Sequence, residues 1–75
     1  METVKNALLT MVDEIEANDN KVSDDVCIRL WDMIWSAEIS EHKELWENLQ
    51  VIHHSSKAAS GKLIKLTLKL LADTL

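Results

Sequence analysis

Proline is absent from this 75-residue chain, and Gly61 is its only glycine. Proline breaks helices, glycine weakens them, and both are common in tight turns. Turns in this chain therefore have to come from clusters of Asn, Asp and Ser. The chain also lacks Phe and Tyr, and it has no alternating run of apolar and polar residues long enough for a sheet. The sequence therefore predicts an all-α fold, in the form of a small helical bundle.

Apolar residues recur at spacings of three and four, which is typical of helices with one buried face. The spacing predicts three or four helices, over residues 2–17, 24–39, 41–53 and 56–73. Ser23 or Asp24 can cap the second of these helices, and Ser55 or Ser56 can cap the last one. Ser40 favours a break between the two middle segments, although these segments could also form one long bent helix.

The last predicted helix is apolar around an unusually wide arc. Its three lysines and Asp73 keep to a sector of about 80°, whereas its apolar residues spread over about 160° of the other side. A chain this short has a small core, and Cys27 has no second cysteine with which to form a disulfide. We therefore expect a single domain, residues 1–75, that is completed by dimerisation or by a higher oligomer. The predicted dimer interface consists of Leu63, Ile64, Leu68 and Leu71.

Charge divides the chain into two unequal parts. Residues 1–54 carry 4 basic and 12 acidic side chains, whereas residues 55–75 carry 4 basic and 1 acidic side chain. Binding to nucleic acid or to a membrane surface is therefore not predicted, because the three lysines at positions 62, 65 and 69 are few and the rest of the chain repels phosphate. The start of the chain lacks the pattern of a secretory signal, which predicts a cytoplasmic protein.

Three tryptophans within 16 residues are the most unusual feature of the composition. We expect Trp31 to pack in the core and at least one tryptophan to reach the surface. Tryptophan is enriched among the few residues that dominate interface energies, so Trp35 and Trp46 are predicted to bind a protein partner. The neighbouring carboxylates of Asp32 and Glu38 would make that surface acidic, although a solvated surface is the simpler account of the many acidic residues.

The segment from Ser56 to Leu63 has a faint outline of a phosphate-binding loop. It lacks a glycine at position 56, a Ser or Thr at position 63 and a preceding strand, so nucleotide hydrolysis is not predicted. A weaker interpretation keeps a phosphate-bearing ligand at the start of the last helix, where free N–H groups point outward. The residues of that alternative site are Ser55, Ser56, Lys57, Ser60 and Lys62.

Catalytic and metal-binding patterns are weak in this sequence. Cys27 lies in an apolar helical stretch, where a thiol is ordinarily buried and inert. Adjacent histidines such as His53 and His54 point in different directions on a helix, and there is no pair of ligands at zinc-binding spacing. The sequence therefore predicts no catalytic residue, no metal site and no cofactor.

The favoured function is a small non-enzymatic regulator or inhibitor that docks on a larger protein through an acidic helical surface bearing tryptophan. The alternative is a module that binds or sequesters a small phosphate-bearing ligand, for example a nucleotide, at the start of the last helix. Neither interpretation identifies the partner or the ligand.

Overall fold

A computed structural model describes residues 2–75, which form helices and connecting turns without any strand. The helices are α1 (Glu2–Ala17), α2 (Asp24–Ile34), α3 (Ala37–Ser40), α4 (Lys43–Ser55) and α5 (Gly61–Asp73). The prediction of an all-α fold is therefore confirmed. The limits of α1 agree with the predicted helix over residues 2–17.

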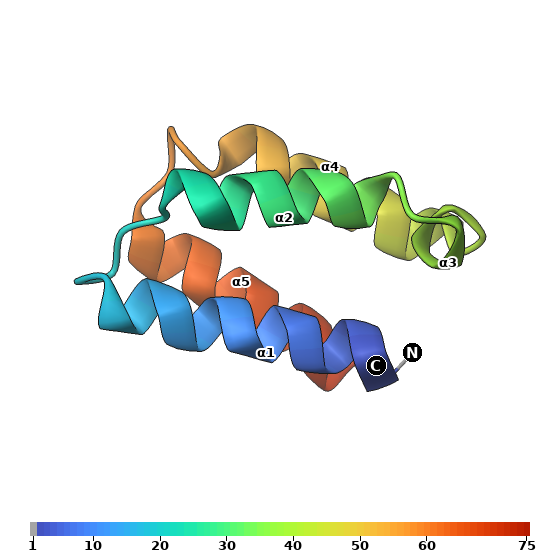
Figure 1. Cartoon of the computed structure of the whole chain (residues 1–75), viewed down its shortest axis with the longest axis horizontal. Helices are drawn as coiled ribbons and strands as arrows, with labels where there is room; N and C mark the ends of the chain where they lie inside the picture. Colours follow the sequence, from blue (N-terminus) through green and yellow to red (C-terminus); the bar gives the residue numbers. More distant parts are fainter. Residues whose placement is uncertain (1) are drawn as a thin grey trace.

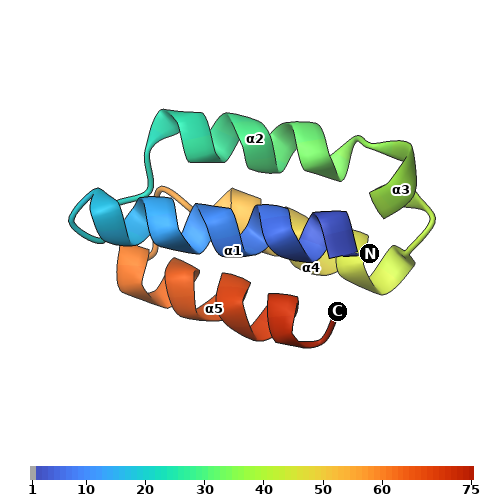
Figure 2. The same ribbon diagram turned by 60° about the horizontal axis from the view of Figure 1, so that its bottom comes forward.

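The four longer helices form a bundle, and the short α3 turns the chain at one end of it (Figure 1). Helix α1 packs against α5, α2 packs against α4, and α4 also contacts α5. Figure 2 shows α2 and α5 on opposite sides of the bundle, with α1 and α4 between them. The Cα atoms extend over 33 × 20 × 17 Å, with the helices running along the longest axis. A bundle of three to four helices therefore describes the chain well, while dimerisation stays a prediction.

Each helix contributes apolar side chains to one continuous core. Leu8, Leu30, Leu49 and Leu68, from the four long helices, are fully buried. The other buried apolar residues are Val4, Met11, Val12, Ile15, Val26, Ile34, Ile39, Leu45, Ile52, Ile64 and Ala72. Their spacing of three or four residues within each helix follows the helical period, so one face of each helix is buried.

The middle of the chain breaks differently from the prediction. The second helix ends at Ile34 rather than at residue 39, and α3 and α4 follow as separate helices. Ser36 explains the break, because its hydroxyl accepts the N–H of Ile39 and donates to the carbonyl oxygen of Met33. A side chain that competes for backbone groups in this way starts a new helix. The alternative of one long bent helix is therefore wrong, whereas the predicted cap at Ser23 is confirmed, since its hydroxyl accepts the N–H of Val26.

The last helix begins at Gly61, not at residue 56. Helix α4 continues to Ser55, and Ser56 caps its C-terminus with an N–H bonded to the carbonyl oxygen of His53. Ser60 is the N-cap of α5, since its hydroxyl accepts the N–H of Leu63. The prediction that Ser55 or Ser56 caps the last helix is therefore wrong.

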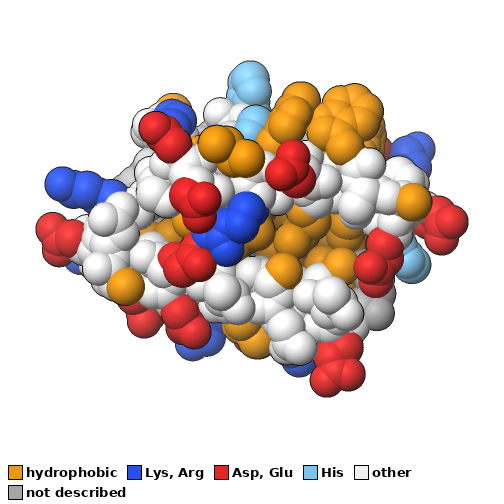
Figure 3. Space-filling model, in the orientation of Figure 1, with side chains coloured by type: hydrophobic (Ala, Val, Ile, Leu, Met, Phe, Trp, Pro, Cys, Tyr) orange, Lys and Arg blue, Asp and Glu red, His pale blue; other side chains and the backbone are white. Residues whose placement is uncertain are grey.

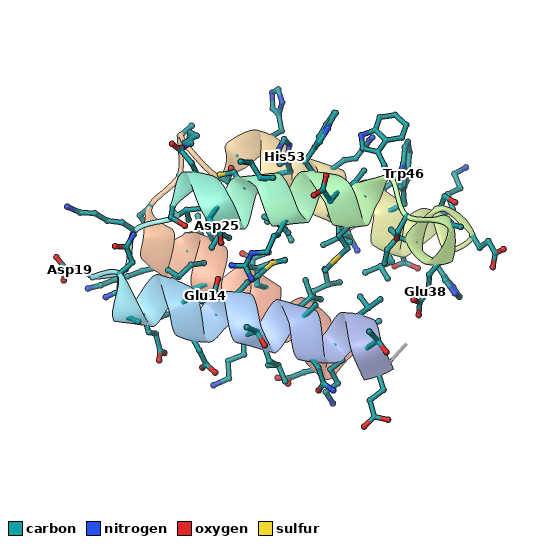
Figure 4. All side chains as sticks on the ribbon, in the orientation of Figure 1. Glu14, Asp19, Asp25, Glu38, Trp46 and His53 are labelled. Atoms are coloured by element: carbon teal, nitrogen blue, oxygen red, sulfur yellow. The ribbon has the colours of Figure 1, made fainter. Side chains whose placement is uncertain are left out.

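Arg29 and Lys65 make polar contacts between parts of the bundle. Arg29 on α2 forms ion pairs with Asp25 on the same helix and with Glu14 on α1. Figure 4 shows both carboxylates in the space between α1 and α2. At the end of α1, the ammonium group of Lys65 on α5 lies 2.9 Å from the side-chain oxygen of Asn20 and 3.4 Å from a carboxylate oxygen of Glu16.

Candidate functional site: an exposed tryptophan face

Helix α2 has two apolar faces. Its buried face carries Val26, Leu30 and Ile34, which fall within a sector of about 80° at 100° per residue. Ile28, Trp31 and Trp35 fall within about 60° on the other side, and they are 59%, 47% and 64% exposed. The expectation that Trp31 packs in the core is therefore wrong. Leu30, the preceding residue, occupies the core, and the next position along a helix points about 100° away.

The exposed aromatic side chains contact one another. The rings of Trp31 and Trp35 meet edge to face at an interplanar angle of 71°, with centroids 5.5 Å apart, and the ring centroid of His53 on α4 lies 5.0 Å from that of Trp31. Edge-to-face packing of this kind fixes the orientation of aromatic rings. Figure 3 shows hydrophobic side chains gathered along the upper edge of the molecule, over α2, with histidine beside them.

Two hollows flank these rings. One, of about 440 Å³, is lined by Trp31, Val51, His53 and their neighbours. The other, of about 530 Å³, is lined by Ile34, Trp35, Ser40, Lys43 and Trp46. The structure therefore brings the predicted partner residues Trp35 and Trp46 into one hollow. We call the surface formed by Ile28, Trp31, Trp35, Trp46 and His53 the tryptophan face.

The two carboxylates predicted beside this surface are placed differently. Asp32 is exposed on α2, next to Trp31 in the chain. Glu38 is on α3, at one end of the bundle, and Figure 4 shows it below α3, pointing away from Trp46. Glu47, which follows Trp46 on α4, is exposed and was not predicted to take part. Asp32 and Glu47 are therefore the carboxylates nearest in the chain to the rings of the tryptophan face.

The sequence reasoning missed Ile28, Trp31 and His53 as members of this surface. The spacing of Ile28, Trp31 and Trp35 is a helical stripe and could have indicated a second apolar face on α2. It was missed because Trp31 was assigned to the core and Ile28 was not considered. No pattern in the sequence places His53 beside Trp31, since that contact depends on how α4 packs against α2.

The residues of the predicted phosphate site are divided among different structural roles. Ser55 and Ser56 stand at the C-terminal end of α4, where carbonyl oxygens rather than N–H groups are free. The hydroxyl of buried Ser56 donates to the carbonyl oxygen of His53, and its oxygen lies 3.3 Å from the sulfur of Cys27. Ser60 caps α5, and Lys62 is exposed in the first turn of that helix.

Lys57 is engaged by an acidic residue of α2. Its ammonium group donates a hydrogen bond to the carboxylate of Asp24, and the two side chains form an ion pair. This hydrogen bond, together with the charge of Lys57, lowers the pKa of the Asp24 carboxyl below its ordinary value. The same hydrogen bond raises the pKa of Lys57. The five residues therefore do not present one group of donors to a phosphate at a helix start.

The residues predicted for a dimer interface also separate. Ile64 and Leu68 are 3% and 0% exposed and belong to the core of the single chain. Leu71 is partly buried against that core, whereas Leu63 is 54% exposed. On the described surface of α5, Leu66 and Leu70 are also exposed, and the sequence reasoning did not include them.

Other chemistry finds little support in the described chain. Among residues 2–75, His, Cys, Asp and Glu side chains form no group of three that could hold a metal ion. No helix in this range is both long enough and apolar enough to cross a membrane. A further hollow, of about 640 Å³, lies at the start of α4 and is lined by His42, Lys43, Leu71 and their neighbours. Trp31 on α2 and His53 in the second half of α4 do not line this hollow.

Comparison with protein families, with characterised proteins and with solved structures finds no match to this chain. Its fold and surface therefore define it only as a small helical bundle with an exposed tryptophan face.

Proposed function

We propose that this protein is a small non-enzymatic regulator or inhibitor that docks on a larger protein through its tryptophan face. The observation that carries the proposal is the exposure of Trp31 and Trp35, two large side chains held against each other outside the core. Exposed apolar patches on small proteins commonly mark interaction sites, and tryptophan often dominates the energy of an interface.

The charge of the surrounding segment supports a basic partner. Residues 24–55 contain seven acidic and two basic side chains, and Asp32 and Glu47 adjoin the tryptophans in the chain. Opposite charges around an apolar contact speed association and select among partners. The partner surface that fits best is therefore an apolar groove or helix with basic residues at its rim.

The non-enzymatic character of the proposal rests on how the reactive side chains are used. Cys27 is partly buried beside the Ser56 hydroxyl, and His53 stacks on Trp31. The phosphate-binding alternative has no comparable support, because its residues belong to separate structural roles.

The proposal can be tested by comparative capture from cells that make the protein. The bait proteins are the wild type, a Trp31→Ala/Trp35→Ala variant and a matched Leu66→Ala/Leu70→Ala variant, each checked for helicity by circular dichroism. A true partner is captured by the wild type and by the leucine variant, and is lost with the tryptophan variant. If every captured protein is retained by the tryptophan variant, or is lost equally with the leucine variant, the tryptophan face is not the docking site.

A further inference from the structure

Helix α5 repeats the two-faced pattern of α2. Its buried side chains, Ile64, Leu68 and Ala72, fall within about 80° of arc. Leu63, Leu66 and Leu70 fall within about 60° on the opposite side, and they are 54%, 53% and 58% exposed. A helix that is apolar on two opposite sides is typical of a position between two packed layers. The single chain supplies only one of those layers.

The exposed leucines of α5 continue onto α4. A groove of about 340 Å³ between the two helices is lined by Val51 on α4 and by Thr67 and Leu70 on α5, among others. Val51 is 65% exposed. We call the surface formed by Val51, Leu63, Leu66 and Leu70 the α4–α5 face.

The two helices of this face carry opposite charges. Glu44 and Glu47 are exposed on α4, whereas Lys62 and Lys69 are exposed on α5. The two helices are adjacent and run in opposite directions along the bundle (Figure 1). The face therefore has an acidic helix and a basic helix on either side of an apolar groove, which makes it complementary to itself.

We propose that a second copy of this chain covers the α4–α5 face, with α4 of each copy lying on α5 of the other. A two-fold axis running along the helices produces this arrangement, and it closes the assembly at two subunits. Apolar side chains then meet across the axis, and the acidic helix of each copy meets the basic helix of its partner.

Size supports a second copy that uses both helices. Stable interfaces cover about 800 Å² on each partner, which is more than three leucines on one helix provide. Contact through both α4 and α5 uses Val51, the groove and the flanking charges as well. The proposed interface differs from the sequence prediction, because Ile64 and Leu68 belong to the core and Val51, Leu66 and Leu70 replace them. The tryptophan rings of α2 are outside this face.

The first test is the mass of the full chain by sedimentation equilibrium from micromolar to millimolar concentration. We expect a reversible equilibrium between the 8.5 kDa chain and its dimer. Val51→Glu or Leu66→Glu should weaken the dimer at least tenfold, since each places two unpaired charges in the interface. Ile28→Glu is the matched control, because Ile28 is similarly exposed but lies on α2, and it should leave the dimer unchanged. Circular dichroism confirms that each variant is folded.

Three results would overturn the proposal. They are a monomer mass at every concentration, masses that grow beyond the dimer, and an equal loss of dimer in the Ile28→Glu control. A monomer mass would mean that the leucines of α5 are left to another protein or to a lipid surface.

A second test uses charge reversal to check which helix meets which. Glu44→Lys/Glu47→Lys makes α4 basic, and Lys62→Glu/Lys69→Glu makes α5 acidic. Each variant alone brings like charges together at both contacts of the dimer, so each should dimerise at least tenfold more weakly than the wild type. An equimolar mixture restores opposite charges at both contacts, and it should form a heterodimer. A mixture that stays monomeric while the wild type dimerises would exclude the pairing of α4 with α5.

Discussion

The backbone carbonyl oxygen of Asn20 lies so close to Gly61 that it fills the space a Cβ atom on residue 61 would need. The turn after α1 therefore packs directly on the backbone at the start of α5. Asp19 and Asn20 both have positive φ angles, of 58° and 57°, in this turn. Asn and Asp tolerate that conformation better than other non-glycine residues. The residue types of this turn and the glycine at position 61 therefore both allow the turn after α1 to pack against the start of α5.

Gly61→Ala should destabilise the fold, because the added methyl group meets backbone rather than a side chain that can move aside. We expect a loss of about 1–3 kcal/mol in the free energy of unfolding, as for other overpacked sites. Urea denaturation measures it. Lys62→Ala, one residue further along the same turn of helix, is the control and should change the stability little. Equal stability of Gly61→Ala and the wild type would contradict the close contact with Asn20.

Leu68→Ala and Leu66→Ala should differ sharply, although both shorten a leucine on α5. Leu68 is fully buried, so its truncation should cost about 2–5 kcal/mol through lost contacts and the resulting cavity. Leu66 is 53% exposed, and its truncation should cost less than about 1 kcal/mol in the isolated chain. Thermal unfolding at low micromolar concentration compares the two while self-association is minimal. Similar losses for both variants would mean that the buried face of α5 is assigned incorrectly.

The sequence was sufficient to predict the helical class and the limits of α1, because the helical spacing of Val4, Leu8, Met11 and Ile15 repeats without interruption. It was insufficient for the start of α5. Ser55, Ser56 and Ser60 are all acceptable caps by composition, and the choice among them depends on the contact between Gly61 and Asn20, which are 41 positions apart. A tertiary contact of this kind has no signature in the local pattern.

The serine caps supply a test of the corrected helix limits. The hydroxyls of Ser23 and Ser60 accept N–H groups at the starts of α2 and α5. Replacing either serine with alanine should lower the free energy of unfolding by about 1 kcal/mol. Ser40→Ala is the matched control. Ser40 is the last residue of α3, and its hydroxyl donates to the carbonyl oxygen of Ala37 instead of accepting an N–H group at a helix start. Urea denaturation measures the free energy of unfolding of the three variants. A loss for Ser40→Ala as large as that for Ser23→Ala and Ser60→Ala would contradict the assignment of Ser23 and Ser60 as helix caps.

The pKa of the Asp24 carboxyl should be lower than its ordinary value, and this lowering should depend on Lys57. The hydrogen bond from Lys57 favours the ionised carboxylate, so the pair stabilises the fold above the ordinary pKa of aspartate. That contribution is lost as the pH falls through the lowered pKa. Carboxyl chemical shifts followed by NMR from pH 2 to 7 measure the titration directly.

Lys57→Met is the variant that checks this cause. It should return the pKa of Asp24 towards its ordinary value, because Lys57 is the lysine that forms the ion pair with Asp24. Lys62→Met is the control, and it should leave the pKa of Asp24 lowered. The effect on stability should be small, because both side chains are exposed and screened by solvent. An unchanged titration in Lys57→Met would show that another group holds the carboxylate.

Trp35→Ala should leave the fold almost intact, since the side chain is 64% exposed and contacts mainly the ring of Trp31. We expect a loss below about 1 kcal/mol, in contrast to the roughly 2–5 kcal/mol for Leu30→Ala in the core of the same helix. Thermal melts of the two variants compare them. A loss for Trp35→Ala as large as that for Leu30→Ala would place Trp35 in the core and remove it from the tryptophan face.

The candidate site shows what residue type alone can and cannot predict. The abundance of tryptophan correctly indicated that at least one ring reaches the surface. It could not separate Trp31 from Trp35, because both follow core positions by one residue on the same helix. Glu38 was grouped with the tryptophans by closeness in the chain, but it lies on α3 at the end of the bundle, where Figure 4 shows it pointing away from Trp46.

The pairing of α1 with α5 has a consequence for how this chain is made in the cell. The ribosome releases α1 first, yet the apolar side chains of α1 find their main partners in α5. Until α5 has been synthesised, Leu8, Met11 and Ile15 lack the helix that makes most of the contacts with α1. The bundle therefore cannot close around α1 before α5 is available, and the pairing of these distant segments comes late in folding.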